Sequence, residues 1–309
     1  MAVNKVAVLG ECMVELQRQG ELYRPNFGGD TLNTAVYFSR LTADKGVSTA
    51  YLTGLGQDDF SEQMLAAWQQ EQIETQYVWR SATKLPGLYT ITTDGLGERS
   101  FHYWRSDAAA RYWLREHTCA SLVALLQQFD WLYLSGVSLA ILPEDSRTLL
   151  FTALEQVKQQ GIKIAFDNNY RPALWADQAQ AQACYRQMLA LTDLAFLTFD
   201  DEQLLWGDVD EQTAISRTQQ AGVVEIVIKR GALPCYIVTA DSRYEVGAEK
   251  VAKIVDTTAA GDSFSAGYLS TRLLGASPEH AAQTGHSLAA TVIQYPGAII
   301  ARQAMAHLS

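Results

Sequence analysis

Short apolar runs rich in β-branched residues alternate with longer stretches of helical periodicity along most of the chain, and this alternation constrains the fold most. The expected strands span residues 5–10, 47–56, 131–136, 163–169, 194–199 and 223–231. The expected helices span residues 30–40, 60–71, 146–161, 181–192, 259–275 and 278–293. Repeated strand–helix alternation is typical of parallel βαβ units with helices on both faces of the sheet. We therefore expect an α/β protein with a doubly wound parallel sheet.

The segment from residue 86 to residue 105 breaks this alternation. Two extended arms, LYTITT and RSFHYW, flank the turn-rich sequence DGLGE at residues 94–98, which predicts a β-hairpin. No repeat, low-complexity tract or linker interrupts the remaining sequence. We expect a single domain over residues 1–309 with a small β appendage.

Charge and cysteine content narrow the class of protein. Lys and Arg number 24 and Asp and Glu number 34, and this net charge of −10 disfavours nucleic acid and anionic membranes as partners. An anionic small molecule stays compatible, because a pocket can be locally positive. The four scattered cysteines, Cys12, Cys119, Cys184 and Cys235, predict neither a disulfide framework nor a zinc site, and they indicate a cytoplasmic location. No apolar run reaches 18 residues, so we expect no transmembrane helix.

The sharpest local motif is DTTAAGDSFSAG, residues 256–267. Ala259, Ala260 and Gly261 come just before a helix expected to start near Asp262, so an anion such as a phosphoryl group could approach the unpaired N–H groups at the helix start. Asp262 would lie beside that anion, where a carboxylate could take a proton from an attacking hydroxyl. From these residues alone, a second interpretation stays open, in which Asp262 is a plain N-cap and Gly261 a turn residue.

The string DTTAAGDSF resembles the C-terminal signature of the ribokinase-type (PfkB-type) sugar kinases, roughly D-T-x-G-A-G-D-x-F. FGGDTLNTAVYFSRL, residues 27–41, resembles the sugar-binding G-G-x-x-x-N-x-A segment of that family. GLGQDDFSEQML, residues 54–65, is similar to its G-x-G-x-D-x-x-G element, with Ser61 in place of the usual glycine. These motifs follow the family order over nearly the whole chain.

The resemblance implies a Rossmann-like core with a β-sheet lid over the sugar, contributed here by about residues 11–28 and 86–106. Further segments, among them GECMVEL, LPGLYTI, GERSFHYWRSDAAA and FDNNYRP, are similar to the members that use ATP and Mg²⁺ to phosphorylate the 6-hydroxyl of 2-keto-3-deoxy-D-gluconate. The reaction implied for this chain is therefore that phosphoryl transfer. The resemblance gives the catalytic part to Ala259, Ala260, Gly261 and Asp262, with Asp262 as the general base.

A sugar acid needs cations for its carboxylate, and the planar fork of arginine suits that group. Arg105 lies at the end of one hairpin arm, and Arg171 follows a core strand in FDNNYRP. The resemblance implies that the substrate contacts Gly29, Asp30, Asn33, Tyr89, Tyr103, Arg105 and Arg171. From the pattern alone, hairpin packing of Tyr103 and Trp104 and a solvated strand end for Arg105 stay open.

On the nucleotide side, VVEIVIKRG ends in Lys229 and Gly231, but the second glycine of the family pattern K-x-G-x-x-G is missing. The positions carried over for ATP are Asn169, Thr198, Lys229, Gly231, Gly261 and His286. His286 stands where the family has an adenine-side Asn, and it either packs against adenine or lies on the helix surface. Asp201 and Glu202 are both candidates for the Mg²⁺ side, and we assign no residue as a direct metal ligand.

Three rival functions stay open on the sequence. The nearest is a kinase of a neutral sugar such as fructose, or of a nucleoside, against which the arginines and the YWR segment argue. A non-catalytic sugar-binding relative would have no chemical need of Asp262. A dehydrogenase is disfavoured because GECMVE, not G-x-G-x-x-G, follows the first strand. The expected partners are a small sugar acid and ATP, and the sequence leaves open whether the chain forms a homo-oligomer.

Overall fold

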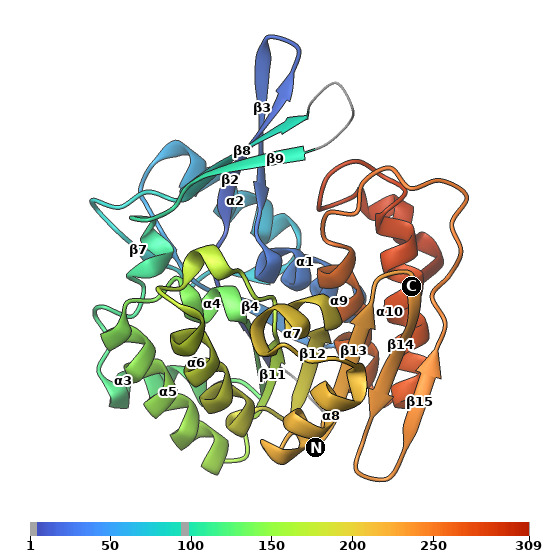
Figure 1. Ribbon diagram of the computed structural model, residues 1–309. Helices are drawn as coiled ribbons and strands as arrows, with labels where there is room; N and C mark the ends of the chain where they lie inside the picture. The colour runs from blue at the N-terminus through green and yellow to red at the C-terminus, as the bar shows by residue number, and fades with distance from the viewer. Residues whose placement is uncertain (1–4, 94–98, 309) are drawn as a thin grey trace.

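A central sheet of nine strands forms the core of the computed structural model, which describes residues 5–93 and 99–308 (Figure 1). The strand order is β15-β14-β13-β12-β11-β10-β1-β4-β6. Seven strands are parallel: β1 (Lys5–Leu9), β4 (Ser48–Leu52), β6 (Ile73–Glu74), β10 (Trp131–Ser135), β11 (Lys163–Asp167), β12 (Leu194–Thr198) and β13 (Glu225–Arg230). Two antiparallel strands extend one edge: β14 (Leu233–Val238) and β15 (Arg243–Val246).

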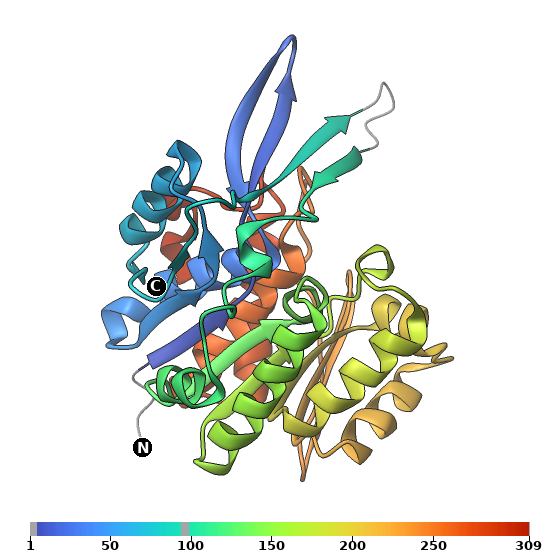
Figure 2. The same ribbon diagram turned by 90° about the vertical axis from the view of Figure 1, so that its left-hand side faces the viewer.

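Helices cover both faces of this sheet (Figure 2). One layer holds α1 (Asp30–Thr42), α2 (Asp59–Gln70), α9 (Ala260–Leu273) and α10 (Pro278–Val292). The other holds α3 (Cys119–Leu126), α5 (Glu144–Gln159), α6 (Gln178–Leu191), α7 (Phe199–Trp206) and α8 (Glu211–Gln220), and the short α4 (Gly136–Ala140) follows β10. In β1, Val6 and Val8 face the first layer while Ala7 and Leu9 face the second, the alternation of a strand buried on both sides. The expected doubly wound α/β fold is confirmed.

A second sheet of four strands, here called the small sheet, projects from the core (Figures 1 and 2). Its order is β3-β2-β8-β9, formed by β2 (Met13–Gln19), β3 (Leu22–Gly28), β8 (Gly87–Thr93) and β9 (Arg99–Trp104). The antiparallel pairing of β8 with β9 confirms the predicted hairpin, whose DGLGE turn lies outside the described residues. Parallel pairing of β2 with β8 joins two hairpins that are far apart in the sequence.

The expected strand over residues 47–56 is two strands, β4 and β5 (Gly54–Leu55), and β5 pairs with β7 (Trp79–Arg80) outside the central sheet. The alternation also missed β14 and β15. Both are short, partly exposed strands at the sheet edge, where polar residues and Pro234 mask the apolar pattern. Short 3₁₀ helices complete the chain at Ala43–Lys45, Ala109–Arg111, Pro172–Leu174 and Arg302–Leu308.

The strand order also locates the binding edge of the central sheet. The chain runs from β1 outward to β4 and β6 and then returns to β10 on the other side of β1, so the order reverses between β1 and β10. Ligands of open α/β sheets bind at the carboxyl ends of the strands beside such a switch point. Within the described residues, every helix is too short or too polar to cross a bilayer.

Candidate active site

Asp262 lies in the first turn of α9, at the carboxyl edge of the central sheet. Its Oδ2 atom accepts a hydrogen bond of 2.8 Å from Nδ2 of Asn33, a residue of α1 that is 229 positions away in the chain. The hydroxyl of Thr34 donates to the Asp262 carbonyl at 3.3 Å, so α1 holds the start of α9 in place. The segment FGGDTLNTA, which contains Asn33, and the DTTAAGD motif therefore meet at one site.

The environment of Asp262 raises its pKa to about 7. Burial is the largest cause, and the neighbouring carboxylates of Asp30 and Asp167 add to it. The hydrogen bond from Asn33 and the charge of Lys229 act in the opposite direction. A carboxylate with a pKa near neutrality is suited to general-base catalysis, because it is both ionised and basic enough at working pH.

The start of α9 can receive an anion. N–H groups in the first turn have no acceptor within the helix, and a Cβ atom at Gly261 would lie 3.5 Å from Nζ of Lys229. The ammonium group and the helix start therefore face the same small volume. Ala259, just before the helix, has a φ of +61°, a left-handed conformation that turns the chain into α9.

Asp167, at the end of β11, holds Lys229 in this position. Its Oδ2 atom accepts a hydrogen bond of 2.7 Å from Lys229 Nζ and one of 2.9 Å from the hydroxyl of Ser265. Two positions further, Asn169 has a φ of +27° and donates from Nδ2 to Asp30 at 2.5 Å. Asp167 is not among the site residues expected from the sequence, although its place at the end of a buried strand in FDNNYRP is a signal for a site residue.

Asn168 joins the ends of two neighbouring strands. Its Oδ1 atom accepts hydrogen bonds from the backbone N–H of Asn169 at 2.7 Å and of Thr198 at 3.0 Å. Its Nδ2 atom donates to the Thr198 carbonyl at 3.1 Å and to Glu202 at 2.8 Å. The other Glu202 oxygen accepts from Arg217 at 2.7 Å, so this buried carboxylate is enclosed by structural partners.

Asp201 differs from Glu202. It accepts a hydrogen bond of 3.1 Å from the backbone N–H of Tyr170 and lies 3.4 Å from the guanidinium of Arg171. Burial raises the pKa of Asp201, the charge of Arg171 acts against this shift, and the charges of Asp167 and Lys229 have smaller effects. Of the two carboxylates, Asp201 is the one close enough to Asp167 and Lys229 for their charges to act on its pKa. Among residues 5–93 and 99–308, no three His, Cys, Asp or Glu side chains are grouped so as to hold a metal ion.

The two arginines expected to bind a carboxylate have different surroundings. The Arg105 guanidinium forms an ion pair with the buried carboxylate of Glu11, and its side chain is 13% exposed. The interpretation of Arg105 as a solvated residue at a strand end is therefore wrong. The Arg171 side chain is 55% exposed, and its ionic contact with Asp201 is long at 3.4 Å. Arg171 is the more accessible cation.

The aromatic residues of the hairpin differ in their exposure to solvent. Tyr89 is buried and its hydroxyl donates to Glu15 within the small sheet. The Tyr103 ring lies 5.7 Å from the Tyr89 ring but is half exposed, and Trp104 is mostly exposed. Hairpin packing is therefore wrong for Trp104 and incomplete for Tyr103.

Three other expected site residues lie at defined places. Gly29 precedes α1, where any Cβ atom would overlap the carbonyl oxygen of Glu11. Gly231 has a φ of +59° in the turn between β13 and β14. His286 is buried, with Nε2 at 3.0 Å from the Val246 carbonyl and its ring edge-on to Phe264, so the surface interpretation of this histidine is wrong.

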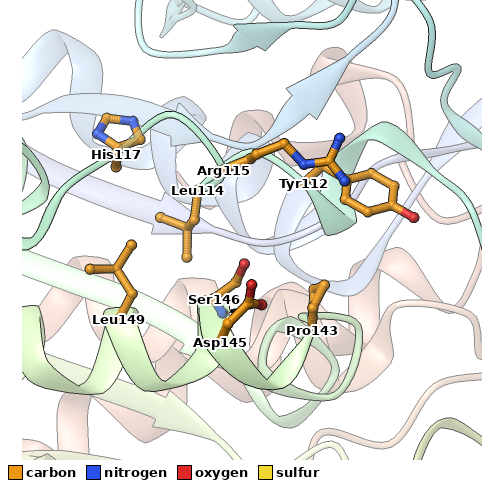
Figure 3. Close-up of a pocket in the computed structure, with 8 residues that line it drawn as sticks. All are labelled: Tyr112, Leu114, Arg115, His117, Pro143, Asp145, Ser146 and Leu149. Atoms are coloured by element: carbon orange, nitrogen blue, oxygen red, sulfur yellow. Dashed lines mark hydrogen bonds between the residues drawn. The ribbon is translucent and has the colours of Figure 1, made fainter.

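A cavity of about 420 Å³ lies elsewhere, between the segment 112–117 and the first turn of α5 (Figure 3). Arg115 stacks over the Tyr112 ring at 4.4 Å on one wall, and Asp145 and Ser146 form part of the other. Side chains of both charge signs line it, and none of the residues of the Asp262 site does.

Comparison with known proteins gives consistent results over the whole chain. Residues 3–305 match the model of the pfkB family carbohydrate kinases. A 2-dehydro-3-deoxygluconokinase from Dickeya dadantii (strain 3937) is 52% identical over 99% of both chains. One from Escherichia coli (strain K12) is 51% identical over 98% of this chain and 99% of its own.

Solved structures show the same fold. Fructokinase from Vibrio cholerae O395, bound to fructose, ADP and a calcium ion, superimposes with a TM-score of 0.84 over 99% of both chains at 24% identity. A putative ribokinase II from E. coli, in complex with ATP and Mg²⁺, gives 0.83 over 96% of this chain and 94% of its own at 22% identity. With the family match and the full-length relatives, these findings establish that the chain belongs to the pfkB family of carbohydrate kinases.

Proposed function

We propose that this protein transfers the γ-phosphoryl group of ATP to the 6-hydroxyl of 2-keto-3-deoxy-D-gluconate, also called 2-dehydro-3-deoxygluconate, to give 2-keto-3-deoxy-6-phosphogluconate. The observation that carries the chemistry is the Asp262 carboxylate, with a pKa of about 7, at the start of α9 beside Lys229. The choice of sugar is supported by the full-length relatives of that activity, at 52% and 51% identity.

Asp262 is the general base. It takes the proton of the 6-hydroxyl while that oxygen bonds to the γ-phosphorus, and the bond from this phosphorus to the leaving ADP oxygen breaks. Backbone N–H groups of Ala259, Gly261 and Asp262 and the Lys229 ammonium stabilise the charge on the transferring phosphoryl oxygens, whereas the Ala260 N–H donates to the Thr257 carbonyl at 3.2 Å. The small residues Ala259, Ala260 and Gly261 leave the backbone open to that group.

The substrate is placed by groups around Asp262. Asp30 and Asn33 hydrogen-bond to sugar hydroxyls, and Gly29 lets the chain pass close to the sugar. Arg105 and Arg171 take the carboxylate, and the half-exposed Tyr103 ring packs against the carbon chain. Tyr89 acts through the Glu15 pair that braces the small sheet.

The nucleotide side fits ATP with Mg²⁺. The metal ion, when bound, neutralises charge on the ATP phosphates. Mg²⁺ prefers oxygen ligands and keeps several waters, and we propose Asp201 as the carboxylate that holds such a water, because Glu202 is occupied by Asn168 and Arg217. Lys229, Asn169 and Thr198 face the phosphates, and Gly231 shapes the loop beside them. His286 supports the adenine side through its contact with Phe264.

The chain acts as one kinase domain over residues 1–309, with the small sheet as a lid. A lid over the sugar excludes water and so limits hydrolysis of ATP without a sugar acceptor. We place the protein in the cytoplasm, which is supported by four unpaired cysteines, three of them buried.

A neutral-sugar kinase is the second candidate. The fructokinase neighbour shares the fold but only 24% identity. The Arg171 side chain is 55% exposed and so accessible to an anionic ligand. A neutral sugar would give this arginine no carboxylate to bind, which disfavours the second candidate.

The test is ADP release by the purified protein with Mg-ATP and either 2-keto-3-deoxygluconate, fructose, ribose or adenosine. We expect strong turnover with the sugar acid alone. Asp262→Ala should lower kcat by several orders of magnitude and leave ATP affinity largely intact. Preference for a neutral sugar would overturn the substrate assignment, and absence of turnover with all four would favour a non-catalytic sugar-binding protein.

A further inference from the structure

Glu11 lies where all four strands of the small sheet join the core. It belongs to the link between β1 and β2, and its ion-pair partner Arg105 directly follows β9. Gly87, the first residue of β8, is so close that a Cβ atom there would lie 2.9 Å from Glu11 Oε1 and 3.2 Å from Arg105 Cβ. Gly29, which directly follows β3, packs against the Glu11 backbone.

The Glu11–Arg105 pair is buried and has few other partners. Glu11 is 1% exposed and Arg105 Nη2 donates to its Oε2 atom. Within the described part of the chain, Glu11 Oε1 and Arg105 Nε have no hydrogen-bond partner. Asp30 and Arg111 are the other charged groups that act on Glu11. A buried carboxylate with a single strong partner binds that partner firmly, because separating them would leave two uncompensated charges.

We infer that Glu11 is a positioning residue that orients the Arg105 guanidinium toward the acid group of the substrate; this inference rests on the proposed function. The guanidinium is a rigid plane with five donors, so fixing one nitrogen fixes the direction of the others. Glu11 itself does not touch the reacting atoms. Its contribution is to hold a long, flexible side chain in one orientation before the substrate binds.

The main test uses Glu11→Gln, which keeps the shape and removes the charge. We expect the KM for 2-keto-3-deoxygluconate to rise about tenfold, with the KM for ATP within about twofold of the wild-type value and kcat within about threefold. Because Glu11 acts through Arg105, the variant Glu11→Gln/Arg105→Ala should have the same sugar KM as Arg105→Ala alone.

Glu71→Gln is the matched control. It removes the carboxylate that pairs with Arg40 at 2.6 Å, a buried guanidinium at the opposite end of α1 from Asp30. This control should lower Tm without changing the ratio of the two KM values. Should Glu11→Gln not fold, Gly87→Ala serves instead, since its added methyl group displaces the same pair without removing a functional group.

Parallel rises in both KM values, an unchanged sugar KM, or additive effects in the double variant would overturn the inference. The proposed function is judged separately, on the wild-type protein. If the wild type turns over only a neutral sugar, the proposed function fails. The inference for an acid group then fails with it. In that case, a rise in the KM for the neutral sugar but not in the KM for ATP in Glu11→Gln would show that Glu11 positions Arg105 for a hydroxyl.

Discussion

The surroundings of Asp262, the proposed general base, shift its pKa towards neutrality. Burial and the nearby Asp30 carboxylate disfavour its charged form, while the amide of Asn33 stabilises it. Asp30 and Asn33 both come from the first turn of α1, so residues at the start of α1 adjust the pKa of a carboxylate at the start of α9. The pKa of about 7 is the balance of these effects.

This balance predicts the pH dependence of the reaction. Asp262 must be ionised to accept a proton, so kcat/KM for the sugar should fall about tenfold per pH unit below pH 7 and level off above it. Asp30→Asn removes a charge that raises the pKa of Asp262, so the acid limb should move to lower pH. Asn33→Ala removes a hydrogen bond that lowers this pKa, so the limb should move to higher pH. Initial rates at saturating Mg-ATP from pH 5 to 9 measure both, and shifts in the reverse directions would contradict the assignment.

Ala259 stands where the related motif D-T-x-G-A-G-D has a glycine, and its φ is +61°. A left-handed conformation costs an L-residue about 1–2 kcal/mol, whereas the extra unfolded-state entropy of glycine costs about 0.5–1 kcal/mol. Ala259→Gly should therefore raise the free energy of unfolding by about 0.5–1 kcal/mol. Ala260→Gly is the control, because Ala260 is helical and glycine there should lower it. Urea unfolding compares the two, and equal effects would show that the left-handed turn carries no strain.

At the scale of elements, the position of α9 depends on close helix packing. Gly267 of α9 lies against Gly285 of α10, where a Cβ atom at Gly267 would be 2.9 Å from Gly285 Cα. The two small residues let the helices approach, and the first turn of α9 then reaches the Asn33 amide. The site is therefore built from helix starts and strand ends held by the core.

The two carboxylates at the start of α7 should differ in their roles. Glu202→Gln removes the charge that pairs with Arg217, so it should lower the free energy of unfolding by about 2 kcal/mol. It should leave the Mg²⁺ concentration for half-maximal activity within about twofold. Asp201→Asn should raise that concentration several-fold with little change in Tm, because Asp201 lies within electrostatic reach of Lys229 and is proposed to hold a water of the metal ion. Thermal melts and Mg²⁺ titrations measure both, and exchanged phenotypes would reverse the assignment.

At the scale of the whole molecule, the proposed substrate site draws residues from two sheets. Arg105 is at the root of the small sheet, and Arg171 follows β11 of the central sheet. In the proposed mechanism, closure of the small sheet over the core would bring groups from both sheets onto one small molecule. This arrangement couples the choice of substrate to the exclusion of water.

The variant Arg171→Ala tests whether the central sheet contributes a cation to substrate binding. Arg171→Ala should raise the KM for 2-keto-3-deoxygluconate about 10- to 100-fold, since a hydrogen bond to a charged group contributes about 1.5–3 kcal/mol. The KM for ATP should change by less than about twofold. Arg115→Ala, at the exposed arginine of the cavity in Figure 3, is the control and should change neither value. Steady-state kinetics with each substrate varied in turn would contradict the role if both KM values rose together.

Periodicity and motifs in the sequence were sufficient for six of the seven parallel strands, for six of the longer helices and for the β8–β9 hairpin, whereas β6, α3, α7 and α8 were not predicted. These features depend on local preferences and on burial of one face or both, which a strand or helix shows in its own residues. The start of α9 at the DTTAAGD motif was likewise predictable, because a run of small residues before a stretch of helical periodicity can be recognised in the sequence.

Only the tertiary structure decided which side chains meet. The Asn33–Asp262 hydrogen bond, the Asp167–Lys229 pair and the Glu11–Arg105 pair join residues 62 to 229 positions apart, and no local pattern specifies such contacts. The burial of His286 was also undetermined, because a histidine on a helix looks the same in the sequence whether or not a strand covers it. Helix starts and strand ends acquire partners, and with them a shifted pKa such as that of Asp262, only when the sheet brings them to one edge.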